Sequence, residues 1–303
     1  MDQPNLTSPA RAVPIPSMSD TPVWRTMALT LLALVAFAGN SLLCRQALQH
    51  SAIDAASFSS LRLAAGAAML AGIVRWRGAA AAPARRDGWA AFMLFAYVAC
   101  FSFAYDWLDA ATGALILFGA VQVTMFAAGL RARERLSAGA WTGVAAALAG
   151  LVYLVSPGLS APAPQGAALM AAAGLAWGVY SLRGREAGDP LTATAGNFLL
   201  ALPMALMVSA WMWHDARVDA PGVVLALASG ALTSGLGYVV WYAVVPRLGA
   251  LRAATTQLAV PPLAALGGVL WLSEPVTPRL LLASVAILGG IALVLSAQSR
   301  ATR

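Results

Sequence analysis

The side chains that could carry out chemistry are few in this sequence, and they form no recognisable catalytic or metal-binding set. All twelve acidic residues fall in terminal segments, in loops or at the ends of apolar stretches. The two histidines, His50 and His214, fall in loops. The two cysteines, Cys44 and Cys100, lie in different apolar stretches, where we interpret them as small buried hydrophobic residues. We therefore expect no catalytic residues, no cofactor and no metal site, because such sites need several neighbouring groups.

One acidic pair leaves a membrane-embedded enzyme as a remote alternative. Asp106-x-x-Asp109 has the spacing of a magnesium-binding motif of prenyltransferases. No second acidic motif accompanies it in the sequence, and two aspartates in a short turn are explained more simply as caps of the adjoining helices. We expect that the protein is not an enzyme.

Arg62 is the single charge that lies well inside an apolar stretch. At roughly 1.5 Å per helical residue it lies about 10 Å from the nearer end of that stretch. A charge at this depth is costly and has two interpretations. The side chain snorkels to the interface or caps carbonyl groups, or it is a counter-charge for a carboxylate on a substrate.

Ten apolar stretches of similar length must position these side chains. Hydrophobic residues make up 60% of the chain and charged residues 10%, and the mean hydropathy is +0.75. A bilayer core takes roughly 20 residues of apolar helix to cross. We therefore predict an all-α integral membrane protein with ten transmembrane helices at residues 27–48, 55–74, 88–105, 110–130, 139–156, 166–182, 191–213, 222–245, 250–272 and 279–297.

Two of these boundaries need a judgement about turns. Asp106 and Asp109 are the only charges in residues 88–130, so we place a tight turn there. Pro246-Arg247 divides the next long apolar run, and Gly249 favours a turn after it.

The predicted organisation is two helical units joined by a linker. Residues 1–26 read as a disordered cytoplasmic tail, and the long apolar run after them is an uncleaved first helix instead of a signal peptide. Residues 27–156 form the first unit, 157–165 the linker, 166–297 the second unit and 298–303 a second cytoplasmic tail.

The basic residues give the orientation. All nineteen are arginines. Three of them, Arg45, Arg217 and Arg279, fall on the side opposite the N-terminus, whereas fifteen fall on the side of the N-terminus. The positive-inside rule then places both termini in the cytoplasm. The net charge of +7 is explained by orientation signals and contacts with anionic lipid, so we expect no nucleic-acid partner.

The two units are related by an internal repeat with an offset of about 140 residues. Glu134 and Ser137 match Glu274 and Thr277 at this offset. Each unit has five spans, and since five is odd, the second unit is inverted relative to the first. Inverted repeats place a substrate site near the bilayer midplane and work by alternating access.

This arrangement resembles the EamA-type members of the drug/metabolite transporter superfamily. Glu134 and Glu274 follow the fourth span of each unit, and the runs 113–125 and 176–183 are similar to one bacterial branch of the family. The resemblance covers about residues 27–297 and implies export of small metabolites. Members of this shape include amino-acid exporters, among them an aromatic amino acid exporter, so the resemblance implies a multi-pass protein of a bacterial inner membrane.

The candidate substrate-binding residues are polar or aromatic side chains within the spans. Asn40, Trp177 and Tyr180 carry the most weight, because the repeat brings the first helix of each unit to the central axis. The full set is Asn40, Arg62, Tyr97, Tyr105, Gln122, Trp177, Tyr180, Asn197, Tyr238, Trp241 and Gln257. We expect these side chains to line a central cavity between the units, with aromatic and neutral polar walls.

Two features predict where helices bend. Pro261-Pro262 removes two backbone donors in the middle of the ninth span and frees carbonyl groups near Gln257. Gly235 belongs to a small-residue face on the eighth span that allows sliding or bending. Broken helices at mid-depth are where transporters bind substrate, although a kink that only fits the packing is an equal alternative.

The partners expected from the sequence are a small-molecule substrate and the lipid bilayer, and the protein is a monomer or a homodimer. The preferred function is export of amino acids, aromatic or otherwise large and neutral. Export of a drug or of a nucleoside or sugar metabolite is the alternative within the superfamily, and a flippase of lipid-linked sugars is disfavoured because only Arg62 would charge the cavity.

Overall fold

The computed structural model describes residues 23–77, 87–131, 137–158, 161–184 and 189–301, and within these ranges the protein is helical without strands. Its elements are α1 Val23–His50, α2 Ala55–Trp76, α3 Gly88–Ala104, α4 Ala110–Arg131, α5 Ala138–Val155, α6 Pro164–Gly184, α7 Pro190–Trp211, a short 3₁₀ helix η2 Trp213–Asp215, α8 Ala220–Ala228, a π-helix η3 Ser229–Leu236, α9 Gly237–Gln257, α10 Val260–Leu272 and α11 Pro278–Ala301.

The acidic residues at the ends of apolar stretches begin the helices. Asp54 accepts hydrogen bonds from the backbone N–H groups of Ala56 and Ser57 at the start of α2. Asp87, Asp189 and Asp219 cap α3, α7 and α8 in the same way. The first N–H groups of a helix have no partner within the helix, and a capping carboxylate is worth about 1 kcal/mol.

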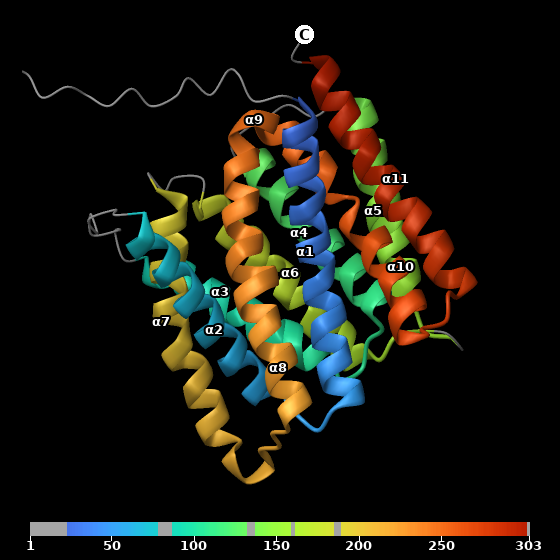
Figure 1. Ribbon diagram of the computed structural model, residues 1–303. Coiled ribbons are helices and arrows are strands. Elements are labelled where there is room, and N and C mark those ends of the chain that lie inside the picture. The colour runs from blue at the N-terminus through green and yellow to red at the C-terminus, as the bar shows by residue number, and fades with distance from the viewer. Residues whose placement is uncertain (1–22, 78–86, 132–136, 159–160, 185–188, 302–303) are drawn as a thin grey trace, which may run out of the picture.

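Helices of the two predicted units are interleaved. The helix α6 packs against α3 and α4, and in turn α1 packs against η3, α9 and α10. Two further pairs, α2 with α7 and α5 with α11, also join one unit to the other. Figure 1 shows that α1 begins and α11 ends at the same, upper end of the bundle.

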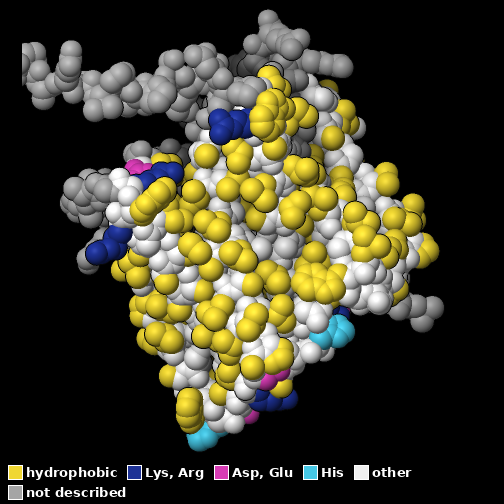
Figure 2. All heavy atoms as spheres, in the orientation of Figure 1, with side chains coloured by type: hydrophobic (Ala, Val, Ile, Leu, Met, Phe, Trp, Pro, Cys, Tyr) yellow, Lys and Arg dark blue, Asp and Glu magenta, His cyan; other side chains and the backbone are white. Residues whose placement is uncertain are grey.

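The sides of the bundle are apolar. Figure 2 shows hydrophobic side chains spread over the visible face, with charged side chains near its upper and lower ends. Six helices of the described residues are long and apolar enough to cross a membrane: α1, α2, α4, α5, α7 and the run Ala220–Val244. The helices α3 and α10 and residues Pro278–Val294 of α11 are apolar but shorter.

Most predicted spans correspond to one helix, and the eighth and ninth are rearranged. The predicted turn at Pro246 is wrong, since α9 is helical from Gly237 to Gln257. One proline removes a single donor and bends a helix without ending it, and Figure 1 shows α9 turning over at the upper end of the bundle. The helix α11 continues to Ala301, into the segment predicted as a tail.

The predicted break at the double proline is confirmed. The helix α9 ends at Gln257 and α10 begins at Val260, with Pro261 and Pro262 in its first turn. Proline is well tolerated there because the first N–H groups of a helix have no partner within it. The predicted eighth span begins as α8, passes into η3 and continues into α9.

Candidate functional site

A small cavity lies between the two predicted units. Its free space is about 20 Å³, measured as the volume open to the centre of a water-sized sphere, which is enough for about one water molecule. Its walls come from α1, α3, α4, α6 and α9 and are mostly aromatic or neutral polar. The lining residues are Phe37, Asn40, Ser41, Tyr97, Phe101, Leu117, Phe118, Trp177, Tyr238 and Gln257.

Trp177 is the centre of an aromatic cluster. Its ring centroid lies 4.9 Å from that of Tyr97, 5.3 Å from that of Tyr238 and 5.5 Å from that of Tyr180. Trp177 reaches the middle of this cluster because Gly174 and Gly178 let α6 pack closely on α4. An added Cβ at Gly178 would lie 2.6 Å from the Cβ of Thr124.

Asn40 is held by the π-helix. Its Oδ1 accepts hydrogen bonds from Ser229 Oγ at 3.0 Å, Thr233 Oγ1 at 2.6 Å and Ser234 Oγ at 3.3 Å. The i→i+5 pattern of a π-helix places residues four and five apart on one face, where all three hydroxyls meet α1. With its oxygen satisfied, the group that Asn40 offers to the cavity is its amide nitrogen, a donor.

Arg62 is buried beside the cavity, with 1% of its surface exposed. Its Nε donates to Ser234 Oγ at 3.2 Å and its Nη2 to Tyr97 Oη at 3.1 Å. The guanidinium carbon lies 4.9 Å from the ring centroid of Phe101, which lines the cavity. Arg62 therefore does not snorkel to the interface.

The charge of Arg62 is not balanced within the described part of the chain. Its Nη1 has no hydrogen-bond partner there, and no described carboxylate forms an ion pair with it. A buried cation without an anion is costly, and unmatched donors add to the cost. The arrangement at Arg62 is therefore suited to receive an anionic group.

A glycine in the π-helix allows it to pack closely against α2 at Arg62. An added Cβ at Gly230 would collide with the carbonyl oxygen of Arg62, so only glycine lets η3 pack on the backbone of α2. This close approach brings Ser234 to the guanidinium of Arg62. The predicted bending residue Gly235 also lies in η3, where a Cβ would be 3.0 Å from Cγ of Met69.

A second hollow is apolar and separate from the cavity. It has about 370 Å³ of space on the same measure and lies between α4, α10 and α11. Pro261 and Pro262 line it together with side chains such as Leu115 and Leu280. The double proline thus borders this hollow, while the break before it places Gln257 at the cavity.

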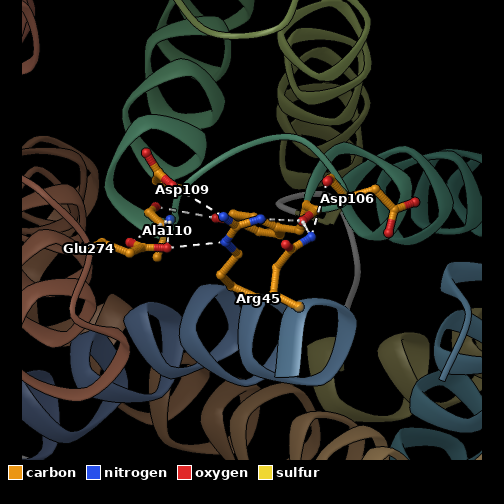
Figure 3. Close-up of polar contacts among 7 residues, drawn as sticks. Arg45, Asp106, Asp109, Ala110 and Glu274 are labelled. Atoms are coloured by element: carbon orange, nitrogen blue, oxygen red, sulfur yellow. Dashed lines mark hydrogen bonds and ion pairs between the residues drawn. The ribbon is translucent and has the colours of Figure 1, made fainter. Parts of the chain in front are cut away.

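A charged cluster lies at the lower end of the bundle in Figure 1. Arg45, near the end of α1, donates to Glu274 Oε1 at 3.1 Å, to Asp109 Oδ1 at 3.2 Å and to the carbonyl oxygen of Tyr105 at 3.0 Å. Figure 3 shows Arg45 reaching from α1 to these groups. Both oxygens of Glu274 also accept from the backbone N–H of Ala110, at 3.0 and 2.9 Å.

Burial dominates the titration of the carboxyl groups near this cluster. It raises the pKa of Glu274 above its ordinary value, although the N–H of Ala110 and the Arg45 guanidinium act in the opposite direction. Burial also raises the pKa of Asp106, which follows α3, to about 6.

Known proteins similar to this chain include transporters. The profile of the EamA-like transporter family matches residues 164–296. An uncharacterized protein of Pseudomonas aeruginosa, PA1977, is 56% identical over 273 residues, which cover 90% of this chain and 95% of that protein. The threonine/homoserine exporter RhtA of Escherichia coli K12 is 29% identical over 284 residues, covering 90% of this chain and 92% of RhtA.

The chain belongs to the EamA-type transporters of the drug/metabolite transporter superfamily. It is therefore a multi-pass membrane protein and a small-molecule exporter by family. The crystal structure of a protein 22% identical in sequence superposes with a TM-score of 0.65, covering 89% of this chain and 99% of that one, which shows a shared fold.

The transporter brings five of the candidate residues to the cavity wall: Asn40, Tyr97, Trp177, Tyr238 and Gln257. Arg62, Tyr180 and Trp241 lie behind this wall in contact with its residues. Tyr180 packs on Trp177, and Trp241 packs on Phe37 with ring centroids 5.5 Å apart.

Three other candidates are buried but do not line the cavity. Tyr105 packs edge-to-face against Phe101, with ring centroids 4.9 Å apart, and fills the space over Gly113. Gln122 on α4 and Asn197 on α7 lie between helices. Sequence reasoning missed Ser229, Thr233 and Ser234 as partners of Asn40, because the direction in which their small-residue face points leaves no pattern in an apolar span.

Proposed function

We propose that this transporter exports neutral amino acids with apolar side chains, most favourably large or aromatic ones, across a bacterial inner membrane. The observation that carries the proposal is Arg62, a buried cation with one unused nitrogen and no described acidic partner, beside an aromatic cavity. An amino acid supplies the carboxylate that this cation lacks. The name of the relative RhtA, a threonine/homoserine exporter, supports amino acids as the coarser substrate class.

The carboxylate of the substrate and the rest of the molecule contact different parts of the cavity in this proposal. The carboxylate takes Arg62 Nη1 and the amide nitrogen of Asn40, which are both donors. The ammonium group and the apolar side chain lie against Trp177 and Tyr238, since aromatic rings attract cations and pack on apolar groups. The described lining contains no carboxylate, which disfavours a purely cationic drug.

Alternating access explains how so small a cavity serves an amino acid. About 20 Å³ does not admit one, so the cavity must widen when the units move apart. The packing partners support a two-fold relation between the units, because exchanging the units turns the contacts of α6 with α3 and α4 into those of α1 with η3, α9 and α10. The odd number of predicted spans in each unit would make this repeat an inverted one. Such a repeat can open first to one side and then to the other.

Exchange across proteoliposomes tests the proposed substrate. Vesicles loaded with phenylalanine, leucine or threonine should exchange it for labelled external substrate, whereas matched amines without the carboxylate, such as phenethylamine, should not be carried. Transport confined to quaternary cations or nucleosides would contradict the proposal and favour the drug or nucleoside alternative.

A further inference from the structure

The cluster of Arg45, Asp109 and Glu274, named here the outer clasp, joins the two units at one end of the molecule. Arg45 and Asp109 belong to the first unit, and Glu274 lies between α10 and α11 of the second. The side chains of Arg45 and Glu274 are 15% and 9% exposed, so this ion pair is largely removed from water. The two units cannot separate at this end without breaking it.

The outer clasp lies in line with the cavity. Phe37, Asn40 and Ser41 line the cavity from one face of α1, and Cys44 continues that face by one more turn before Arg45 is reached. On the opposite wall Phe101 of the cavity packs edge-to-face against the fully buried Tyr105, whose carbonyl oxygen accepts from Arg45. Cys44 and Tyr105 thus lie between the cavity and the clasp, and both are fully buried.

The local backbone fixes Glu274 in place. The helix α10 ends at Leu272, and the next residue, Ser273, has a left-handed φ of 55°. The N–H groups of Ser273 and Glu274 both donate to the carbonyl oxygen of Gly268. An added Cβ at Gly268 would collide with the carboxylate of Glu274. The chain therefore turns back over α10 and directs Glu274 at the start of α4 (Figure 3).

We propose that Arg45, Asp109 and Glu274 form the gate that closes the outer end of the transport path. The proposal rests on alternating access, and "outer" rests on the arginine distribution. For the cavity to open outward, Glu274 must leave both Arg45 and the N–H of Ala110, while α10 and α11 move away from α4.

Arg45 is the central residue of this gate. Among the residues that the structure describes it is the one cation paired with both Asp109 and Glu274, so its removal leaves two carboxylates of opposite units facing each other. Removing Glu274 instead leaves Arg45 paired with Asp109. Loss of Arg45 should therefore open the gate more than loss of Glu274, and loss of both should be milder than loss of Arg45 alone.

The native Cys44 reports on the gate. It is fully buried in this closed structure and lies between the cavity and the clasp. In a Cys100→Ala background, intact cells are treated with a membrane-impermeant maleimide, and the labelling rate of Cys44 is compared among variants. We expect Cys44 in Arg45→Gln to be labelled about tenfold faster than in the parent. This value lies between the small effect of losing an exposed ion pair and the large effect of losing a buried one, because the pair is partly exposed. Arg45→Gln/Glu274→Gln should fall between the two.

Asp87→Asn is the matched control. Asp87 accepts from Arg183 Nε at 2.7 Å, an ion pair that also joins the two units, but at the start of α3 and the end of α6. Its loss should leave the external labelling of Cys44 unchanged or lower. A cysteine at the exposed His214 calibrates the reagent.

The labelling experiment tests the gate independently of the substrate. Equal labelling in Arg45→Gln and the parent would overturn the gate, as would an equal rise in Asp87→Asn, which would indicate general loosening. If Arg45→Gln does not accumulate, Arg45→Lys keeps one charge that cannot bridge three acceptors, and its labelling must then exceed that of the parent. Labelling needs no substrate, so a failure of amino-acid exchange leaves this result standing.

Discussion

Arg62 and Arg45 show how the same residue type does two different things in one chain. Arg62 has no described anion and an unused nitrogen, whereas Arg45 has two carboxylates and a carbonyl group. A guanidinium offers five donors in a rigid plane, so the number of satisfied donors distinguishes a site awaiting a ligand from a completed contact.

Replacing Arg62 should affect the binding of the substrate's carboxylate. For Arg62→Gln we expect the KM for amino acids to rise roughly 10- to 100-fold, because a hydrogen bond to a charged group is worth about 1.5–3 kcal/mol. Arg62→Lys should recover part of the loss. Exchange rates in proteoliposomes measure both variants, and an unchanged KM in Arg62→Gln would exclude Arg62 as the anchor.

Trp177 should select for apolar bulk. Trp177→Ala removes the centre of the aromatic cluster, so we expect the KM for phenylalanine to rise about tenfold while that for threonine changes less. Competition between the two amino acids in one assay gives the ratio directly. Insertion and yield in the membrane should stay near those of the parent, and normal phenylalanine transport would count against the aromatic wall.

The outer clasp should respond to pH in a defined direction. Glu274 has a raised pKa in the closed structure, so the closed form binds its proton more tightly than an open, solvated form does, and acid favours closure. Without Arg45 the attraction that lowers this pKa is lost. Labelling of Cys44 in Arg45→Gln should therefore slow as the external pH falls from about 8 to about 5.5.

The other charged groups near Glu274 set the control for that measurement. Asp109 faces it from the start of α4, and Asp106, with a pKa of about 6, lies beyond Arg45. Arg45 also lowers the pKa of Asp106, so its loss affects more than Glu274, and the control is Arg45→Gln/Glu274→Gln, which keeps both aspartates and lacks Glu274. Rates are divided by those of the exposed cysteine at position 214, and a ratio that does not change with pH would contradict the assignment of Glu274.

At the scale of elements, η3 is what makes the polar part of the site. Its hydroxyls fix the amide of Asn40 and one nitrogen of Arg62, and its close approach to α2 depends on Gly230. Gly230→Ala should lower the melting temperature by several degrees and impair transport, because a Cβ there forces η3 off α2.

Gly72→Ala is the matched comparison for that substitution. Gly72 is in α2, and an added Cβ there meets nothing within 4 Å. Alanine is the better helix former by about 1 kcal/mol, so this variant should be as stable as the parent or more so. Thermal unfolding in detergent measures both, and equal stabilities would refute the packing role of Gly230.

The sequence predicts elements better than it predicts their rotation. Spans follow from length and apolarity, and the break at Pro261-Pro262 follows from missing donors. Which side of an all-apolar helix faces inward leaves no pattern, so Tyr105, Gln122 and Asn197 were not separable from Tyr97 and Tyr238. The bond between Arg45 and Glu274 joins positions 229 residues apart and needs the fold itself.

At the scale of the whole molecule, cysteine labelling tests the orientation in the membrane. The arginine distribution predicts that the lower end in Figure 1 faces outward. A cysteine introduced at Pro157 should react with an impermeant reagent in intact cells, whereas one at Gly78 should react only with a permeant one. The reverse result would invert the topology, and with it the side on which the clasp acts.

The buried charge of Arg62 also has a consequence for the membrane that holds the protein. A transporter that widens at mid-depth admits water, and a chain of water molecules conducts protons down the membrane potential. A fixed positive charge beside that water repels protons and sodium ions electrostatically, as arginines do in selective pores. If the protein passes through such open states, the guanidinium that would hold a carboxylate should also limit the leak of protons and sodium ions across the membrane.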